Sequence, residues 1–345
     1  MNRPRFAYRL TAVAALLAAI GVSGAAAAQD SITLRVGDWM PLSHHVSSHG
    51  GKVFMDKATE LSKGRIQFKF FPAEQLGKAK DSLQMVQSGV ADIVNIAPAY
   101  ITDKFPLAGV AELPGIYEGA CKGSYALAEM AGPGGELDAA EFKPNGVRNL
   151  FTAAIGSYRV MTTKKEVKTA DDFKGLKLRT AGGPMDQTAK LLDAVSIRMA
   201  GPDVLISLQR GTLDGVFWPI LSVKPWGLHE VIKHWTPNLG VGSFVDYWVI
   251  SEKSWSKIPK DLQDILVEAG KYATKSHCEY VDSSDAAEVE SLKKGGMKPI
   301  DLPDADVKKI TEHYGEIYKS WAQGLDQRGR PGTKILDVFR SKVGS

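Results

Sequence analysis

The residues of this sequence best suited to chemistry are two arginines. Arg159 lies in the segment GSYRVMTT and Arg179 in KGLKLRT, and each stands beside a strand-like stretch. A guanidinium group presents its N–H donors in a rigid planar fork, so two such groups at one cleft would hold a carboxylate in a fixed orientation. The same pattern also suits two surface strand residues in ion pairs. The pair therefore indicates an anion site without establishing it.

Histidines form a second candidate group. His44, His45 and His49 lie within SHHVSSHGG, and a spacing of four could place His45 and His49 on one face of a helix, as in some zinc sites. No Asp or Glu in this run completes a ligand set, so we expect a solvated turn and no metal. The chain also lacks GxSxG, HExxH, a P-loop and a GxGxxG after a strand. We therefore expect no enzyme activity, no catalytic residues and no cofactor.

The composition is that of a globular protein that carries a secretion signal. The 345 residues are 44% hydrophobic and 24% charged, and the length suits about two domains. Arg3, Arg5 and Arg9 precede an apolar run over residues 10–22, which predicts a signal peptide over residues 1–28 and a location in the periplasm. Without these arginines, 40 basic residues face 39 acidic ones. A nearly neutral chain argues against a nucleic-acid partner.

Two cysteines remain for an oxidising compartment. Cys121 and Cys278 have no CxxC spacing, which excludes a thioredoxin-like motif and a zinc ribbon. Whether they form a disulfide depends on how distant segments pack, and the sequence leaves this open.

The predicted elements alternate in the manner of an α/β protein. Strand-like segments at residues 32–37, 65–72 and 91–96 alternate with helical segments at residues 46–62 and 78–88. A second block of the same kind follows, and then a strongly β-prone FVDYWVI and a long helical stretch over residues 260–294. This order predicts two α/β lobes, with the chain crossing between them more than once.

Six motifs carry a family resemblance because they occur together and in order. They are GRIQFKFFPAEQLG from Gly64, QSGVADI from Gln87, FPL from Phe105, DDFKGLKLR from Asp171, LQRGTLDG from Leu208 and WVISEKSWSKIPKDLQ from Trp248. This ordered set closely resembles the DctP-type extracytoplasmic solute receptors of TRAP transporters, from about residue 32 to about residue 318.

The resemblance implies a fold, a function and partners. The fold would be the two-lobed periplasmic-binding-protein (Venus flytrap) architecture, with a hinge and a long helix that spans both lobes. Its first lobe would comprise residues 29–156 and 244–284, and its second residues 157–243 and 285–345. The protein would be a monomer that captures a small organic acid by hinge closure and delivers it to the membrane subunits of a sodium-driven permease.

The resemblance also assigns roles to the two arginines. The arginine that closes the GLKLR motif is the main carboxylate ligand of the family, and here it is Arg179. A second arginine about 20 residues earlier often assists, and Arg159 stands at that position.

One departure from the family pattern concerns the ligand. Many relatives have Asn before the Pro that follows the LxxGxxDG motif, whereas here Trp218 precedes Pro219. An aromatic lining would comprise Trp39, Phe217, Trp218, Phe244 and Tyr247, although strand alternation places Phe244 or Tyr247 in the core. This favours an acid with an aromatic or apolar body. The alternative ligands are a C4-dicarboxylate, a 2-oxo acid and a sugar acid. The alternative function is that of a secreted hydrolase instead of a receptor.

The first lobe should contribute further contacts through two loops. One contains Ser43, His44 and His45, of which we assign His45 to the ligand site, and the other contains Asn95 and Tyr100. Asn95 is the strongest candidate, because a polar side chain at the end of an apolar strand needs a hydrogen-bond partner.

Overall fold

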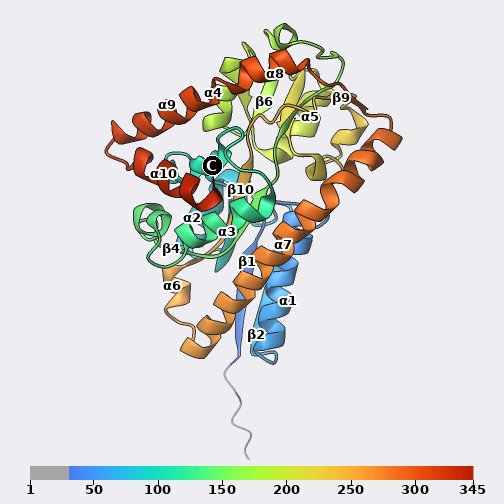
Figure 1. Cartoon of the computed structure of the whole chain (residues 1–345). Coiled ribbons are helices and arrows are strands. Elements are labelled where there is room, and N and C mark those ends of the chain that lie inside the picture. Colours follow the sequence, from blue (N-terminus) through green and yellow to red (C-terminus); the bar gives the residue numbers. More distant parts are fainter. Residues whose placement is uncertain (1–30, 345) are drawn as a thin grey trace, which may run out of the picture. The chain divides into compact units, whose positions relative to one another are not determined.

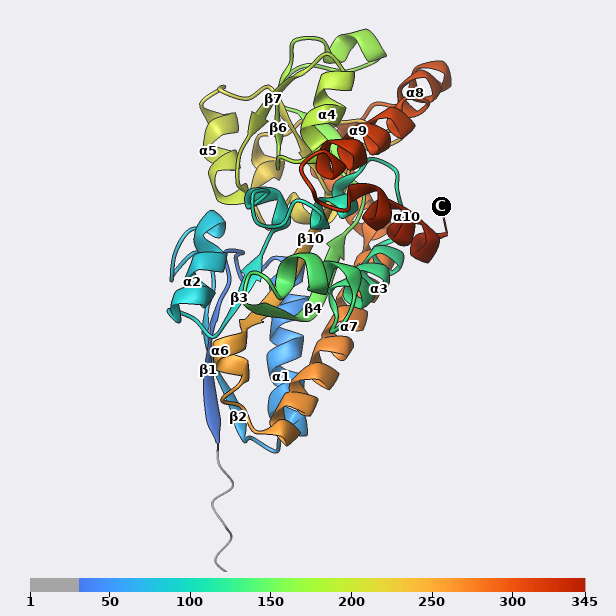
Figure 2. The same ribbon diagram turned by 90° about the vertical axis from the view of Figure 1, so that its left-hand side faces the viewer.

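A five-stranded sheet forms the centre of the first lobe (Figures 1 and 2). The computed structural model describes residues 31–344, so the predicted signal peptide lies outside the described residues. The strand order is β2-β1-β3-β10-β4, with β1, β2 and β3 parallel and β10 antiparallel to both of its neighbours. The strands are β1 (Ile32–Gly37), β2 (Ile66–Phe71), β3 (Ile93–Ile96), β4 (Val147–Ile155) and β10 (Phe244–Ser251).

A six-stranded sheet forms the centre of the second lobe, in the order β11-β9-β5-β8-β6-β7. Its strands are shorter, and β5 runs antiparallel to β8 and β9 while β6 is parallel to β7 and β8. They are β5 (Arg159–Thr162), β6 (Lys177–Thr180), β7 (Val195–Arg198), β8 (Gly215–Trp218), β9 (His234–Trp235) and β11 (Lys298–Pro299). The two-lobed α/β fold expected from the sequence is confirmed.

The chain crosses between the sheets in three places. It leaves the first sheet after Ile155, returns to it at Phe244, and reaches β11 again by way of helix α7 (Lys260–Lys294). Helix α7 packs against β4 of the first sheet and against η8 (Ile220–Ser222) of the second lobe. The division into lobes at residues 156/157 and 243/244 stays a prediction from the sequence.

Helix α7 lies very close to β4. A Cβ atom at Gly270 of α7 would stand 1.9 Å from the carbonyl oxygen of Leu150. The helix can approach the strand this closely only because position 270 has no side chain.

Shorter helices complete the layers. They include η1 (Val46–Gly51), α1 (Lys52–Leu61), α2 (Ser82–Ser88), η3 (Pro98–Tyr100), η4 (Ala108–Glu112), α3 (Ala120–Ala131), α4 (Pro184–Leu191), α5 (Val204–Gln209), α6 (Glu252–Trp255), α8 (Asp304–Thr311), α9 (Tyr314–Asp326) and α10 (Gly332–Val343). Helix α10 packs against α3 and η4, beside the first sheet, although the sequence assigned the whole of 285–345 to the second lobe (Figures 1 and 2). No helix within residues 31–344 combines the length and apolar character that crossing a membrane requires.

Cys121 and Cys278 form a disulfide between α3 and α7. The Asp282 carboxylate of α7 also accepts hydrogen bonds from the backbone N–H groups of Ala120 (2.5 Å) and Cys121 (3.1 Å) at the start of α3. The disulfide and this cap fix α3 on the long helix. The pairing that the sequence left open is thus decided by the packing of two helices 157 residues apart.

Candidate ligand site

A buried cation lies where the two lobes meet. Arg179 stands in β6, and its side chain is only 1% exposed. No Asp or Glu within residues 31–344 is among the residues that line the surrounding cavity. The lining consists of Trp39, Met40, His44, Tyr100, Ile155, Tyr158, Arg179, Gly201, Trp218, Pro219, Ser222, Trp226 and Phe244. Because a buried charge is costly unless it is paired, this guanidinium group favours an anion.

Arg179 is held in place by neutral acceptors. Its Nε donates to the Met199 carbonyl oxygen (2.8 Å) and its Nη1 to the Phe217 carbonyl oxygen (3.5 Å). Nη2 donates to Tyr100 Oη (3.0 Å). A guanidinium group has five N–H donors, so one on each terminal nitrogen remains for a carboxylate. Two such donors suit bidentate binding of one carboxylate.

Tyr100 links the lobes at this point. Its hydroxyl oxygen accepts the bond from Arg179 and a second bond, of 3.0 Å, from the backbone N–H of Gly201. Burial raises the pKa of Tyr100, so the phenol stays protonated. Its own O–H is therefore left to donate.

Aromatic rings form the remaining walls. The Trp39 ring lies 5.4 Å from the Tyr100 ring. It is stacked on the Trp226 ring, with the ring centres 6.1 Å apart. The Arg179 guanidinium carbon lies 4.7 Å from the centre of the Trp218 ring. The indole N–H groups of Trp39 and Trp218 have no partner within residues 31–344. The cavity therefore combines apolar faces with unused N–H donors.

The walls approach one another closely. The space between them totals about 260 Å³, but the centre of a water molecule can occupy only about 10 Å³ of it. This is room for about one water. An organic acid can therefore enter only if the lobes or the rings move apart.

A network of buried histidines extends behind the cavity. His44 Nε2 lies 2.8 Å and His45 Nε2 3.2 Å from Ser222 Oγ, and His45 Nδ1 lies 2.9 Å from Nε2 of His277 on α7. Burial lowers the pKa of His44 and of His277 to about 3, so both rings are neutral. The expectation of a solvated turn was wrong for His44 and His45, which are buried by the opposite lobe and by α7. No cluster of three or more His, Cys, Asp or Glu in residues 31–344 is arranged to hold a metal ion.

The structure brings Arg179, Trp39, Tyr100, Trp218 and Phe244 together in one cavity. It places the other predicted residues elsewhere.

Three of these others lie directly behind the cavity wall. His45 contacts His277 and Ser222, and Asn95 Nδ2 donates to Asp38 Oδ1 (3.1 Å). Phe217 contributes its carbonyl oxygen to Arg179, while its ring lies in the core. Each supports the lining without being part of it.

Arg159 and Tyr247 do not line the cavity. The Arg159 guanidinium donates to Ser157 Oγ and, at 3.4 Å, to the carbonyl oxygen of Tyr158. Tyr247 is buried against Phe142, at a ring distance of 5.0 Å. The register pairs Arg159 of β5 with Trp218 of β8, so the two residues share one face of the sheet, but the Arg159 guanidinium turns to Ser157 and is not part of the lining.

The sequence interpretation missed Tyr158, Trp226 and Ser222. Tyr158 stands just before β5, in a connection where no periodic pattern predicts the direction of its side chain. Trp226 and Ser222 lie in a turn-rich connection after β8, where no periodic pattern predicts direction.

Comparisons with known proteins give the family of the chain. The sequence model of the DctP family, described as bacterial extracellular solute-binding protein, family 7, matches residues 40–324. A solute-binding protein of Verminephrobacter eiseniae is 28% identical over 262 residues, which cover 75% of this chain and 77% of that protein.

Two solved structures are also similar. A TRAP periplasmic solute-binding protein of Bordetella bronchiseptica, with bound (R)- and (S)-mandelate, is 27% identical with a TM-score of 0.82, covering 91% of this chain and 99% of that one. A TRAP solute-binding protein of Rhodoferax ferrireducens, in complex with copurified benzoate, is 25% identical with a TM-score of 0.82, covering 91% and 98%. TRAP solute-binding proteins bind small organic acids and work with membrane permease subunits. This chain belongs to the DctP family of bacterial extracellular solute-binding proteins, a family of receptors and not of enzymes.

Proposed function

We propose that this protein is the periplasmic receptor of a TRAP transporter and that it binds an organic acid with an aromatic or apolar body. The observation that carries the proposal is the buried Arg179, which has no carboxylate partner among residues 31–344 and lies among aromatic rings. Relatives at 27% and 25% identity were solved with mandelate and benzoate, which are aromatic acids of this kind.

The ligand carboxylate binds the two free N–H donors of Arg179. The ligand ring then lies among Trp39, Trp218 and Trp226, where burial of apolar surface and ring contacts stabilise it. Hydroxyl substituents, as in mandelate, have the Tyr100 hydroxyl and two indole N–H groups within the same cavity as partners. A sugar acid would leave many of its hydroxyl groups facing ring faces, at a cost in desolvation.

Closure of the lobes holds the acid. Trp39, His44 and Tyr100 come from the first lobe, and the second lobe supplies Arg179, Trp218 and Ser222. Because the cavity is narrow, the acid binds while the lobes are apart. It then stabilises the closed arrangement only to the extent that it binds the closed form more tightly than the open form. The hinge lies in the connections after Ile155 and before Phe244, and the closed receptor delivers the acid to a sodium-coupled permease.

Calorimetric titration tests this proposal. The chain from Gln29 onward is unfolded, refolded to remove bound ligand, and titrated with benzoate, (R)-mandelate, succinate and galacturonate. We expect an aromatic acid to bind at least about tenfold more tightly than succinate or galacturonate, as ring burial of 1.4 kcal/mol or more requires. Tightest binding of succinate or galacturonate would contradict the aromatic preference.

Two further observations test the receptor role. The bound acid is recovered chemically unchanged, whereas the hydrolase alternative consumes it. Uptake of the acid by vesicles that contain the cognate TRAP permease depends on addition of this protein. Uptake that is the same without the protein would contradict the role in transport.

A further inference from the structure

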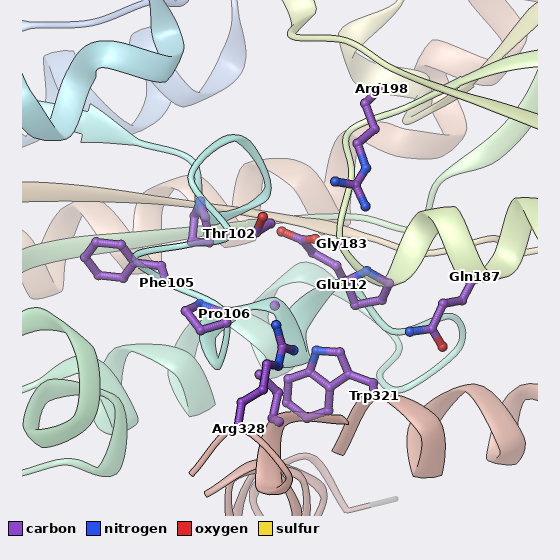
Figure 3. Close-up of a pocket in the computed structure, with 13 residues that line it drawn as sticks. Thr102, Phe105, Pro106, Glu112, Gly183, Gln187, Arg198, Trp321 and Arg328 are labelled. Atoms are coloured by element: carbon purple, nitrogen blue, oxygen red, sulfur yellow. The ribbon is translucent and has the colours of Figure 1, made fainter. Parts of the chain in front are cut away.

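A second cavity lies close to the Arg179 site but does not share its lining. It offers about 190 Å³ to the centres of water molecules, many times the room found around Arg179. Figure 3 shows the side chains around it. The lining comprises Pro98, Thr102, Phe105, Pro106, Gly109, Glu112, Gly183, Pro184, Gln187, Arg198, Trp321, Leu325 and Arg328. It therefore draws on both lobes and on α9.

Glu112 lies at the inner wall of this cavity with unused hydrogen-bonding capacity. It ends η4, its side chain is 0% exposed, and neither of its carboxyl oxygens has a partner within residues 31–344. A Cβ atom at Gly183 would stand 2.7 Å from Glu112 Oε2. The carboxyl group can therefore occupy this position only because residue 183 has no side chain. Burial raises the pKa of Glu112. A cationic group bound beside the carboxyl group would lower this pKa again, because it favours the charged form.

Two guanidinium groups share the lining of this cavity with Glu112, while the nearby carboxylate of Asp186 further raises the pKa of Glu112. In Figure 3 the guanidinium groups of Arg198 and Arg328 reach toward the cavity from opposite sides, with the Glu112 carboxyl between them. Arg198 Nε is paired with Asp186, and Arg328 Nε donates to the Gly324 carbonyl oxygen at 2.8 Å. The terminal N–H groups of Arg328 have no acceptor within the described part of the chain, so they can bind an anion.

The remaining lining is mixed. Trp321, Phe105 and Leu325 give apolar surface, whereas Thr102 and Gln187 supply a hydroxyl and an amide. One buried acid, two guanidinium groups and an apolar wall match a small molecule with an ammonium group, a carboxylate and a short side chain.

We propose that this cavity binds the zwitterion of a small amino acid, with its ammonium group on Glu112 and its carboxylate on Arg198 and Arg328. A small shift of the lobes brings the ammonium group to the buried oxygens. The occupant contacts the first lobe through Glu112 and the second through Arg198, so it stabilises the closed arrangement.

Binding in the second cavity also strengthens acid binding at Arg179, a consequence that rests on the proposed function. Pro98 lines the second cavity and Tyr100 the first, and both belong to η3. Linkage requires the effect to be reciprocal, so the acid at Arg179 strengthens amino-acid binding by the same factor.

The test uses the chain from Gln29 onward and the twenty standard L-amino acids at millimolar concentration, added one at a time. The readout is the indole N–H resonance of Trp321, assigned with Trp321→Phe, together with calorimetric titration. We expect at least one amino acid to shift this resonance in the wild type and also in Arg179→Ala. Glu112→Gln and Arg198→Ala/Arg328→Ala should each weaken that binding by about tenfold or more, because each removes a charged partner. Lys319→Ala is the matched control, because Lys319 is exposed and lies on α9, the helix of Trp321. This variant should bind the amino acid as the wild type does.

Three results would overturn the proposal. One is no shift of Trp321 with any of the twenty amino acids. Another is binding that disappears in Arg179→Ala but persists in Glu112→Gln, which places the amino acid at the first site. If Glu112→Gln does not fold, the double arginine variant decides, and binding equal to wild type in that variant excludes the cavity. Failure of the proposed function is distinct: benzoate then does not bind, while the Trp321 shift persists.

Discussion

Tyr100 of the first lobe and Arg179 of the second are joined by a hydrogen bond of 3.0 Å between Oη and Nη2. The same hydroxyl oxygen accepts the backbone N–H of Gly201. One side chain of the first lobe thus orients the principal cation of the second. This contact makes the geometry of Arg179 depend on closure.

Tyr100→Phe removes the hydroxyl oxygen that accepts hydrogen bonds from Arg179 and from the backbone N–H of Gly201. We expect aromatic-acid affinity to fall about 5- to 30-fold, since an unsatisfied buried donor costs roughly 1–2 kcal/mol. Tyr247→Phe is the matched control, because the Tyr247 hydroxyl is buried but has no partner within residues 31–344. Calorimetric titration with benzoate measures both. Equal losses in the two variants would show that the Tyr100 contact does not matter.

Trp218→Leu tests the ring beside Arg179. The change removes the cation–π contact of 4.7 Å and part of the aromatic wall. We expect benzoate binding to weaken about tenfold or more, as loss of roughly 1–2 kcal/mol implies. Trp255→Leu is the control, because Trp255, at the end of α6, forms a similar cation–π pair with Arg148 of β4 and does not line the cavity. Unchanged benzoate affinity in Trp218→Leu would refute the aromatic lining as the source of preference.

The disulfide should stabilise the fold without affecting the ligand. It joins residues 157 apart, and the chain-entropy argument then gives a loss of about 2–5 kcal/mol in Cys121→Ser/Cys278→Ser. Denaturant unfolding measures this loss, and benzoate affinity should remain that of the wild type. A reducing agent should destabilise the wild type and leave the variant unchanged. Equal stability of the two proteins would contradict the prediction.

The buried histidines make stability depend on pH. Burial lowers the pKa of His44 and of His277 to about 3, below the value of about 6.5 in an unfolded chain. Between these values the unfolded chain binds more protons, so this contribution to stability falls as pH falls. Burial has the opposite effect on two acids, because it raises the pKa of Asp38 to about 6 and of Glu141 to about 7. Those groups favour folding as pH falls toward about 4.

His277→Gln separates the two effects. The free energy of unfolding of the wild type minus that of the variant should decrease by up to about 1.4 kcal/mol per pH unit between about pH 6 and pH 4. Denaturant unfolding at several pH values gives this difference. A difference that does not vary with pH would mean that His277 is not held neutral.

The parts of the fold with a strong local pattern were predictable. The sequence predicted the helix over residues 260–294, and α7 has these bounds. The FVDYWVI segment lies within β10, all of whose residues are buried. In both cases the apolar pattern is continuous over many residues and needs no distant partner to be recognised.

The site was predictable only in part, because direction and burial depend on contacts between distant segments. Arg179 was identified from its motif, and it lies at the cavity. The motif spacing that singled out Arg159 says nothing about where its long side chain turns, and the guanidinium group turns to Ser157. His44 and His45 look like polar loop residues until α7, more than 200 residues later, and the opposite lobe cover them. No local pattern contains that information.

The measurement that tests the central claim most directly is benzoate and (R)-mandelate binding to Arg179→Ala beside Arg159→Ala. Both changes remove a guanidinium group, but only Arg179 lines the cavity. We predict that Arg179→Ala abolishes measurable binding and that Arg159→Ala retains affinity within about threefold, since it breaks no ligand contact. Retained binding in Arg179→Ala, or equal loss in both variants, would contradict the account of Arg179 as the carboxylate ligand.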